Sequence, residues 1–338
     1  MWLSTVAYRV YAFSTLTFLA QLDEPPSGWP QLQARALQSL YPGPRGWAPP
    51  AALHGLPQLG FPGSLPDLDT VALAAKHRVC HWEAAAEGGL DVAARAERLR
   101  QTRLFSTQSL ARPGTWASWF DSSFLLQLDA ASRGPRARGL LRSAVAAAIG
   151  SSDPAVQRAR WQRTCVQLVA PDRAGPLREF LLRRLARWQC GLAAEEMVDR
   201  ALATYPAVAR SVPPRVLSAC IRSLWNGWVT ARRFQRHANC CFGCAGAEDS
   251  VEHYATCPLV AAVAASQLGL PRPGAPAAQL ASFLLLEPPP SPGTATELRR
   301  RALLTASVYL THCWWRHHPG HIPFACQNAL RLILRQLL

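Results

Sequence analysis

The sequence predicts an all-α protein, and three observations lead to this fold class. Apolar residues recur at helical spacing along most of the chain, alternating β-branched segments are nearly absent, and no internal repeat is found. Hydrophobic residues make up 49% of the 338 residues and charged residues only 17%, so most of the chain is expected to fold. We therefore expect an irregular array of many helices.

The first predicted helix covers residues 1–22 and ends at the prolines that follow. It is the only segment whose length and composition suit a membrane span or a targeting signal. Arg9 lies near its middle, and Tyr8, Thr15 and Gln21 make it less apolar. We therefore expect a buried amphipathic helix rather than a membrane anchor. A short helix at 31–40 and an ordered loop at 41–66, rich in Pro and Gly, follow it.

Helical patterns continue from residue 67 to the C-terminus. Before the cysteine-rich segment they cover 68–85, 90–104, 116–131, 137–149, 154–168, 177–190, 193–205 and 215–225. After it they cover 259–268, 277–286, 294–315 and 323–338. Thr294 and Glu297 form a capping box at the start of the third of these helices, which ends at about residue 315. We divide the chain into four regions: 1–66, the helical region 67–238, the cysteine-rich module 239–258 in the C-terminal third, and the helices 259–338.

The cysteine-rich module contains four of the ten cysteines of the chain and one histidine, at positions Cys240, Cys241, Cys244, His253 and Cys257. Three thiolates and one imidazole form the Cys₃His set of a closed, tetrahedral structural zinc site. Either Cys240 or Cys241 can be the first ligand. The alternative is a group of buried thiols beside a helix-capping histidine.

The spacing and the helical phase of this module agree with a CCHC set of zinc ligands. Gly243 gives the first turn the backbone freedom to direct two sulfurs inward. Asp249 or Ser250 can cap a short helix, on which His253 and Cys257 share a face at i and i+4. The proline after Cys257 disfavours helix at that position.

The zinc expected here is structural, and the cofactor prediction is Zn²⁺ in that role. Four protein ligands leave no open position for a catalytic water, so Glu248 and Glu252 have nothing to activate. Clustered cysteines with metal-ligand spacing also favour a reducing compartment. We expect an intracellular protein, nuclear or cytoplasmic.

A net charge of +15 favours a polyanionic partner, because each neutralised phosphate releases counterions. A basic and aromatic segment precedes the module and contains Trp228, Arg232, Arg233, Phe234 and Arg236. This is a candidate nucleic-acid interface, with arginines for phosphates and aromatic rings for stacking on bases. The alternative is a solvated helix face over a buried tryptophan.

A second histidine-rich group lies near the C-terminus, at His312, Cys313, His317, His318 and His321. Histidines are also favoured at the C-terminal end of a helix, and the two tryptophans that follow Cys313 suggest packing. We therefore favour a packed helix end over a second metal site.

Five stretches around the module form one pattern: Trp225-Asn226-Gly227-Trp228, Thr230-Ala231-Arg232-Arg233-Phe234, the turn from Cys240 to Cys244, residues 248–254, and Cys257-Pro258. This pattern resembles the C-terminal zinc-knuckle region of non-LTR (LINE-type) retrotransposon reverse transcriptases. More weakly, residues 8–22 resemble the helix that follows the polymerase palm. The resemblance implies that 1–66 is thumb-like, that the module is the family's zinc knuckle, and that the region contacts template RNA or target DNA. It also favours Cys240 over Cys241, because the family turn has three residues between its cysteines.

The chain departs from this family in its chemistry. No adjacent aspartates occur anywhere, although a polymerase must hold two metal ions with close carboxylates. A nuclease signature is missing as well, since no aspartate follows Asp249. We therefore expect a non-catalytic remnant that binds RNA or DNA and has no small-molecule substrate. The alternative is a helical structural or protein-interaction protein whose zinc only stabilises the fold.

Overall fold

The computed structural model describes residues 2–19, 28–62 except 42, 45 and 46, then 174–286, 295–318 and 323–338, with single positions at 65–74 and 162–166. The described residues contain no β-strand, and their one β-bridge joins Asn239 to Glu248. The protein is all-α, as the sequence predicts. The predicted helices between 90 and 149, and most of those at 68–85 and 154–168, lie outside the described residues.

The described helices follow the chain in this order. They are α1 (Trp2–Ala7), the π-helix η1 (Tyr8–Phe13), α2 (Ser14–Leu19), α3 (Trp29–Leu40), α4 (Pro50–His54), the 3₁₀-helix η2 (Leu56–Leu59), α10 (Ala174–Leu185), α11 (Ala194–Ser211), α12 (Pro214–Leu224), the 3₁₀-helix η4 (Arg232–Phe234), α13 (Val251–Thr256), α14 (Pro258–Val263), the π-helix η5 (Ala264–Leu268), α15 (Pro276–Phe283), α16 (Ala295–His317) and α17 (Pro323–Leu337).

The chain divides into two compact units. One contains residues 1–6, 33–65 and 173–338, and the other contains 7–32 and 66–172. In the second unit the described part includes η1, where the buried rings of Tyr8 and Phe13 lie 5.8 Å apart. The N-terminal segment is thus helical, as expected. No helix of the described residues has the length and apolar character needed to cross a membrane.

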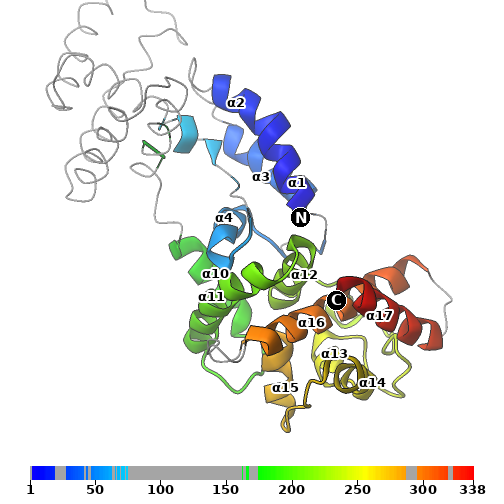
Figure 1. Cartoon of the computed structure of the whole chain (residues 1–338). Helices are drawn as coiled ribbons and strands as arrows, with labels where there is room; N and C mark the ends of the chain where they lie inside the picture. Colours follow the sequence, from blue (N-terminus) through cyan, green and yellow to red (C-terminus); the bar gives the residue numbers. More distant parts are fainter. Residues whose placement is uncertain are drawn as a thin grey trace, which may run out of the picture. The chain divides into compact units, whose positions relative to one another are not determined.

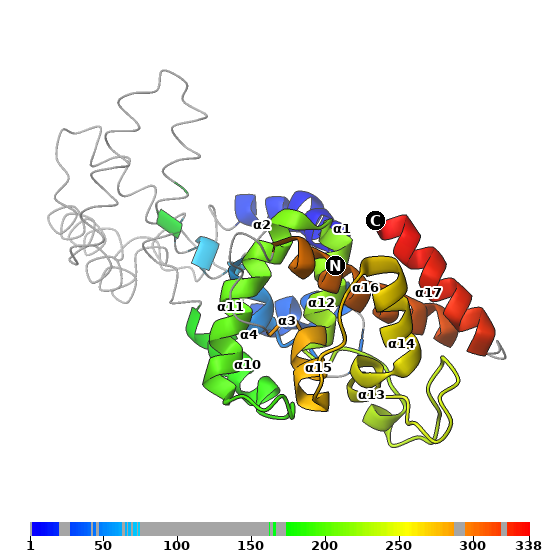
Figure 2. The ribbon, with the colours of Figure 1, turned by 60° about the horizontal axis from the view of Figure 1, so that its bottom comes forward.

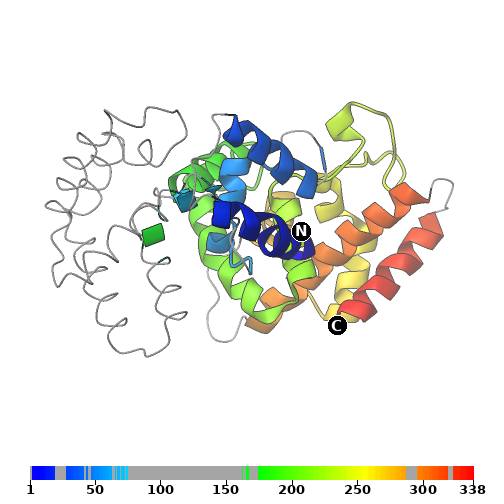
Figure 3. The same cartoon turned by 90° about the horizontal axis from the view of Figure 1, so that it is seen from above.

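The core of the first unit forms where α12, α16 and α17 pack together (Figure 1). Figure 3 shows α16 and α17 side by side. The side of α17 that faces this core carries Cys326, Leu330, Leu334 and Leu337, all at most 7% exposed. Their spacing of three or four residues is that of one helix face, which explains why 323–338 is predictable from sequence. Each fully buried leucine contributes about 1.5–3 kcal/mol.

The expected loop at 41–66 contains two short helices, α4 and η2, and this part of the prediction is wrong. Its prolines start helices rather than interrupt them: Pro50 and Pro57 both lie in a first helical turn, where no hydrogen-bonding N–H is needed. The segment is nevertheless packed on the body, as expected, because Leu53 and Leu56 are fully buried.

Two helix boundaries also differ from the prediction. Helix α11 continues past Pro206 to Ser211, and α10 already ends at Leu185. The apolar contacts of Val208, which is fully buried, extend α11 beyond its proline. Helices α12, α15 and α17 lie within a few residues of their predicted positions.

Candidate metal centre

The first half of the candidate metal centre is a tight turn that follows η4. Cys240 N–H donates to Ala247 O at 2.8 Å, and Gly243 N–H donates to Cys240 O at 3.0 Å. Gly243 has φ +89°, a conformation that favours glycine, and a Cβ there would lie 2.6 Å from Pro323. The predicted role of this glycine in the turn is confirmed.

The second half is α13, which follows the turn and lies beside α14 and α15 (Figure 2). Ser250 caps α13, because its Oγ accepts a hydrogen bond of 3.1 Å from His253 N–H. Cys257 ends the helix with ψ 123°, as the following proline requires. The cap and the stop together set the helical phase that directs His253 and Cys257 to the same side.

The turn and the helix bring Cys240, Cys244, His253 and Cys257 together. One potential ligand atom from each lies within 4.8 Å of the other three, and the sulfurs of Cys244 and Cys257 are 3.4 Å apart. In the part of the chain that the structure describes, these residues form the one such group. This group, the Cys₃His cluster, can hold a metal ion.

Cys241 is not part of the Cys₃His cluster, so its inclusion among the candidate ligands is wrong. Adjacent residues of the turn direct their side chains apart: Cys241 is buried and its thiol interacts with that of Cys326 on α17. Its backbone also contacts the hydroxyl of Tyr254 at 3.5 Å. The open choice between the two neighbouring cysteines is therefore decided in favour of Cys240.

The donor set fits a tetrahedral ion. With metal–sulfur bonds of about 2.3 Å, sulfurs of one tetrahedron are separated by ~3.8 Å, close to the observed spacing. His253 Nε2 is buried and has no hydrogen-bond partner among the described residues, as expected for a nitrogen arranged for a cation. Burial raises the pKa of the Cys244 thiol, and a hydrogen bond with Cys240 raises that of Cys257 to about 12. A bound cation would displace these protons.

Asp249 connects this centre to the helical core. Its carboxylate accepts hydrogen bonds from Ala231 N–H at 2.7 Å and from the Tyr254 hydroxyl at 2.7 Å. It also lies 3.2 Å from Nε2 of His312 on α16, and both side chains are almost fully buried. The sequence does not predict this ion pair, because its two residues are far apart in the chain and no local pattern links them.

Trp228 lies at the middle of the aromatic core beside the cluster, and its prediction as a base-stacking surface is wrong. Its ring is 0% exposed and stacks on Tyr254 at 5.5 Å between centroids. The centroid of its ring also lies 5.3 Å from that of Tyr309, in a T-shaped arrangement, and 5.2 Å from that of His312, whose ring is tilted. Nε1–H donates to Ser223 Oγ at 3.0 Å. The alternative interpretation, a buried tryptophan below the basic face, describes this residue.

The other residues of the predicted interface have different environments. Arg232 is half exposed and lies 3.7 and 3.6 Å from the carboxylates of Glu248 and Glu252. Arg233 is partly buried and donates to Asn226 O, so it belongs to the framework. Arg236 is exposed and Phe234 is 46% exposed. The accessible part of the interface is thus Arg232, Phe234 and Arg236.

The histidine-rich group near the C-terminus does not converge in the described residues. His312 is buried against Asp249, whereas His318 is exposed and its Nδ1 lies 2.8 Å from Trp314 O. His321 lies outside the described residues.

No family profile, curated protein or solved structure matches this chain.

Proposed function

We propose that this protein is a zinc-stabilised nucleic-acid-binding protein, related to the C-terminal region of LINE-type reverse transcriptases and without chemistry of its own. The observation that carries the proposal is the attachment of the accessible basic segment to the Cys₃His cluster. Ala231 N–H and Arg232 N–H both donate to Asp249, one residue before the cap of α13. Folding of the metal centre therefore fixes the segment that carries Arg232, Phe234 and Arg236.

Zinc is the metal that suits this donor set best. Three thiolates and an imidazole in a tetrahedron are typical of structural zinc, while oxygen-rich sites suit magnesium and calcium. Four protein donors fill the coordination sphere, so the ion holds the turn against α13 and leaves no position for a substrate.

The chemistry of the segment supports a single-stranded partner. Arg236 makes no ion pair with any described residue, so its charge is available to a phosphate. Phe234 offers a ring face to a base, and such stacking contributes about 1–3 kcal/mol per base. Arg232 is held over two glutamates, so a phosphate must compete with these carboxylates for it.

The test is filter binding of single-stranded RNA to the zinc-loaded full chain over a salt series. Replacing Arg232 and Arg236 with glutamine is expected to flatten the plot of log affinity against log salt by roughly 1.4, because each arginine–phosphate pair adds about 0.7 to its slope. Phe234→Ala should weaken binding at every salt concentration. Arg299→Gln, an exposed arginine on α16, is the matched control. An unchanged slope in the double variant would contradict the proposal.

The alternative is a helical interaction protein in which the metal only stabilises the fold. One observation favours it: Trp228 and Arg233, two of the five predicted contact residues, belong to the interior framework. The same titration separates the two functions, because this alternative predicts no RNA binding beyond that of any basic protein, and equal effects of Arg236→Gln and Arg299→Gln.

A further inference from the structure

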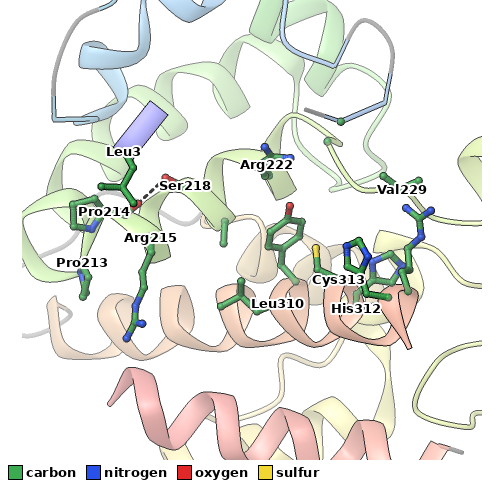
Figure 4. Close-up of a pocket in the computed structure, with 16 residues that line it drawn as sticks. Leu3, Pro213, Pro214, Arg215, Ser218, Arg222, Val229, Leu310, His312 and Cys313 are labelled. Atoms are coloured by element: carbon green, nitrogen blue, oxygen red, sulfur yellow. Dashed lines mark hydrogen bonds between the residues drawn. The ribbon is translucent and has the colours of Figure 1, made fainter. Parts of the chain in front are cut away.

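A cavity of about 940 Å³ lies between α12 and the C-terminal half of α16, and neither the Cys₃His cluster nor the accessible interface of Arg232, Phe234 and Arg236 lines it (Figure 4). One face of each helix lines it. The contributing side chains are Arg215, Ser218, Ala219 and Arg222 from α12, and Tyr309, Leu310, His312, Cys313, Arg316 and His317 from α16. Cavities of small-molecule sites measure about 300–1,000 Å³, so this one is large enough for a complete small ligand.

The charge of the cavity has one sign. Arg215, Arg222 and Arg316 line it, and none of its 16 described lining residues is an aspartate or glutamate. Arg222 is held in place, because its guanidinium lies 4.4 Å from the centre of the Trp47 ring. Cationic groups in a recess with apolar walls concentrate the positive potential there. The cavity therefore selects an anion.

The walls between the arginines are apolar. Figure 4 shows Leu3, Pro213 and Pro214 near Arg215 at one end and Val229 at the other, with Leu310 between them on α16. The ring of Tyr309 adds an aromatic surface to the same wall. A ligand that fills this space needs an apolar or aromatic body in addition to its negative charge.

We propose that this cavity binds a nucleotide, with the phosphate on Arg316 and the base and sugar against the apolar wall. Inorganic phosphate has no body to cover Leu310 and Tyr309. A fatty acid offers two carboxylate oxygens and a flexible alkyl chain, whereas a nucleotide offers three phosphate oxygens and a planar base. Guanidinium groups bind phosphate through paired hydrogen bonds and also stack on planar rings, so nucleotides match both properties of the lining.

Two sources can supply this ligand: a free mononucleotide, or a nucleotide within a single strand. Binding of a nucleotide within a strand (the strand source) rests on the proposed nucleic-acid binding. Binding of a free mononucleotide does not. The residues also differ, because the accessible interface consists of Arg232, Phe234 and Arg236 and the cavity uses Arg215, Arg222 and Arg316.

The experiment is calorimetric titration of the zinc-loaded full chain with AMP, beside adenosine, inorganic phosphate and laurate. We expect AMP to bind more tightly than all three. Arg316→Gln, at an exposed position, should weaken AMP binding about tenfold, as expected when one charge-assisted hydrogen bond is removed. Arg299→Gln is the matched control on α16, outside the lining, and should leave AMP binding unchanged.

Several outcomes would overturn the site: no AMP binding in the millimolar range, adenosine or laurate binding as well as AMP, or equal effects of Arg299→Gln and Arg316→Gln. Competition between AMP and a short single-stranded RNA separates the sources. RNA displaced by AMP and weakened by Arg316→Gln supports the strand source. If RNA binding is changed neither by AMP nor by Arg316→Gln, and AMP still binds, the cavity is a site for free nucleotides. AMP binding without any RNA binding rejects the proposed function and keeps the cavity.

Discussion

The cysteine-rich module and the helix pair α12–α16 are neighbours in one compact unit, yet they are stabilised in different ways. The module contains one six-residue helix and a single β-bridge, so it has little regular structure of its own. Helices α12 and α16 are longer and bury apolar faces with fully buried residues such as Ile221 and Ala306. The comparison teaches that the module has few regular hydrogen bonds and depends on its side chains, whereas the helix pair is regular throughout, so disrupting each should have distinct consequences.

The largest effect is expected from removing a ligand of the Cys₃His cluster. Structural zinc contributes about 10–16 kcal/mol of apparent binding free energy in zinc-finger peptides. If the proposed zinc is bound, Cys240→Ser should lose it and unfold the module. Zinc content by atomic absorption and hydrogen exchange of residues 239–257 measure this outcome. Helices α12 and α16 should keep their exchange protection.

The neighbouring cysteine supplies the matched control. Cys241→Ser changes an equally buried thiol outside the cluster and should retain stoichiometric zinc. Loss of zinc in Cys241→Ser and retention in Cys240→Ser would reverse the assignment of the first ligand.

The next largest effect concerns the aromatic core that both regions share. Trp228→Ala should lower the free energy of unfolding by about 3–5 kcal/mol, because it empties a fully enclosed site. Urea denaturation of the zinc-loaded protein measures it. Phe234→Ala, at a ring that is 46% exposed, should change stability by less than about 0.5 kcal/mol. If both variants lower the free energy of unfolding by the same amount, the division between buried framework and accessible interface is wrong.

A smaller effect is expected from the ion pair that joins the two regions. Burial opposes the charge on His312, but the hydrogen bond and charge of Asp249 outweigh burial and raise the pKa above 6.5. Burial also opposes the charge on Asp249. Its hydrogen bonds, of which the one with His312 has the largest effect, nevertheless lower the pKa of Asp249 below 3.8. The pair therefore contributes fully between pH 3.8 and 6.5 and weakens as pH rises through the raised pKa of His312, or falls through the lowered pKa of Asp249.

His312→Gln tests this linkage. As pH rises above 6.5 and through the raised pKa of His312, the wild-type protein should lose stability relative to the variant, whose amide does not titrate. At pH 6 the variant should be less stable by about 1–3 kcal/mol, the cost of a weakened buried contact. Zinc-loaded protein is used throughout, since metal loss at lower pH would mask the effect. Parallel stability curves for the two proteins would exclude the ion pair as a source of pH dependence.

The smallest effect on stability is expected at the surface. Arg232→Gln removes two exposed ion pairs with Glu248 and Glu252, which together contribute about 0–1 kcal/mol. Thermal unfolding should therefore change little, whereas RNA affinity should fall if Arg232 contacts phosphate. A variant that loses stability and RNA affinity in parallel would place Arg232 in the framework instead.

Local patterns in the sequence were sufficient for the elements of both regions. The spacing of apolar residues located α12, α15 and α17, and Gly243, His253 and Cys257 predicted the turn and the helical phase of the metal centre. These features depend on neighbours within one or two turns of chain, and sequence order gives those directly. Helix ends were less predictable, because buried contacts carry α11 past Pro206.

Other features were decided only by the tertiary structure, because they depend on which distant segments meet. The thiol of Cys241 contacts that of Cys326 on α17, whereas the thiol of Cys240 points into the Cys₃His cluster. Tyr254, Tyr309 and His312 surround Trp228 and convert a predicted stacking surface into core. The sequence by itself thus determined an all-α chain with a cysteine and histidine set that can hold a metal ion. The packing of α16 and α17 against the module decided which side chains remain accessible, since burial is a property of the assembled fold.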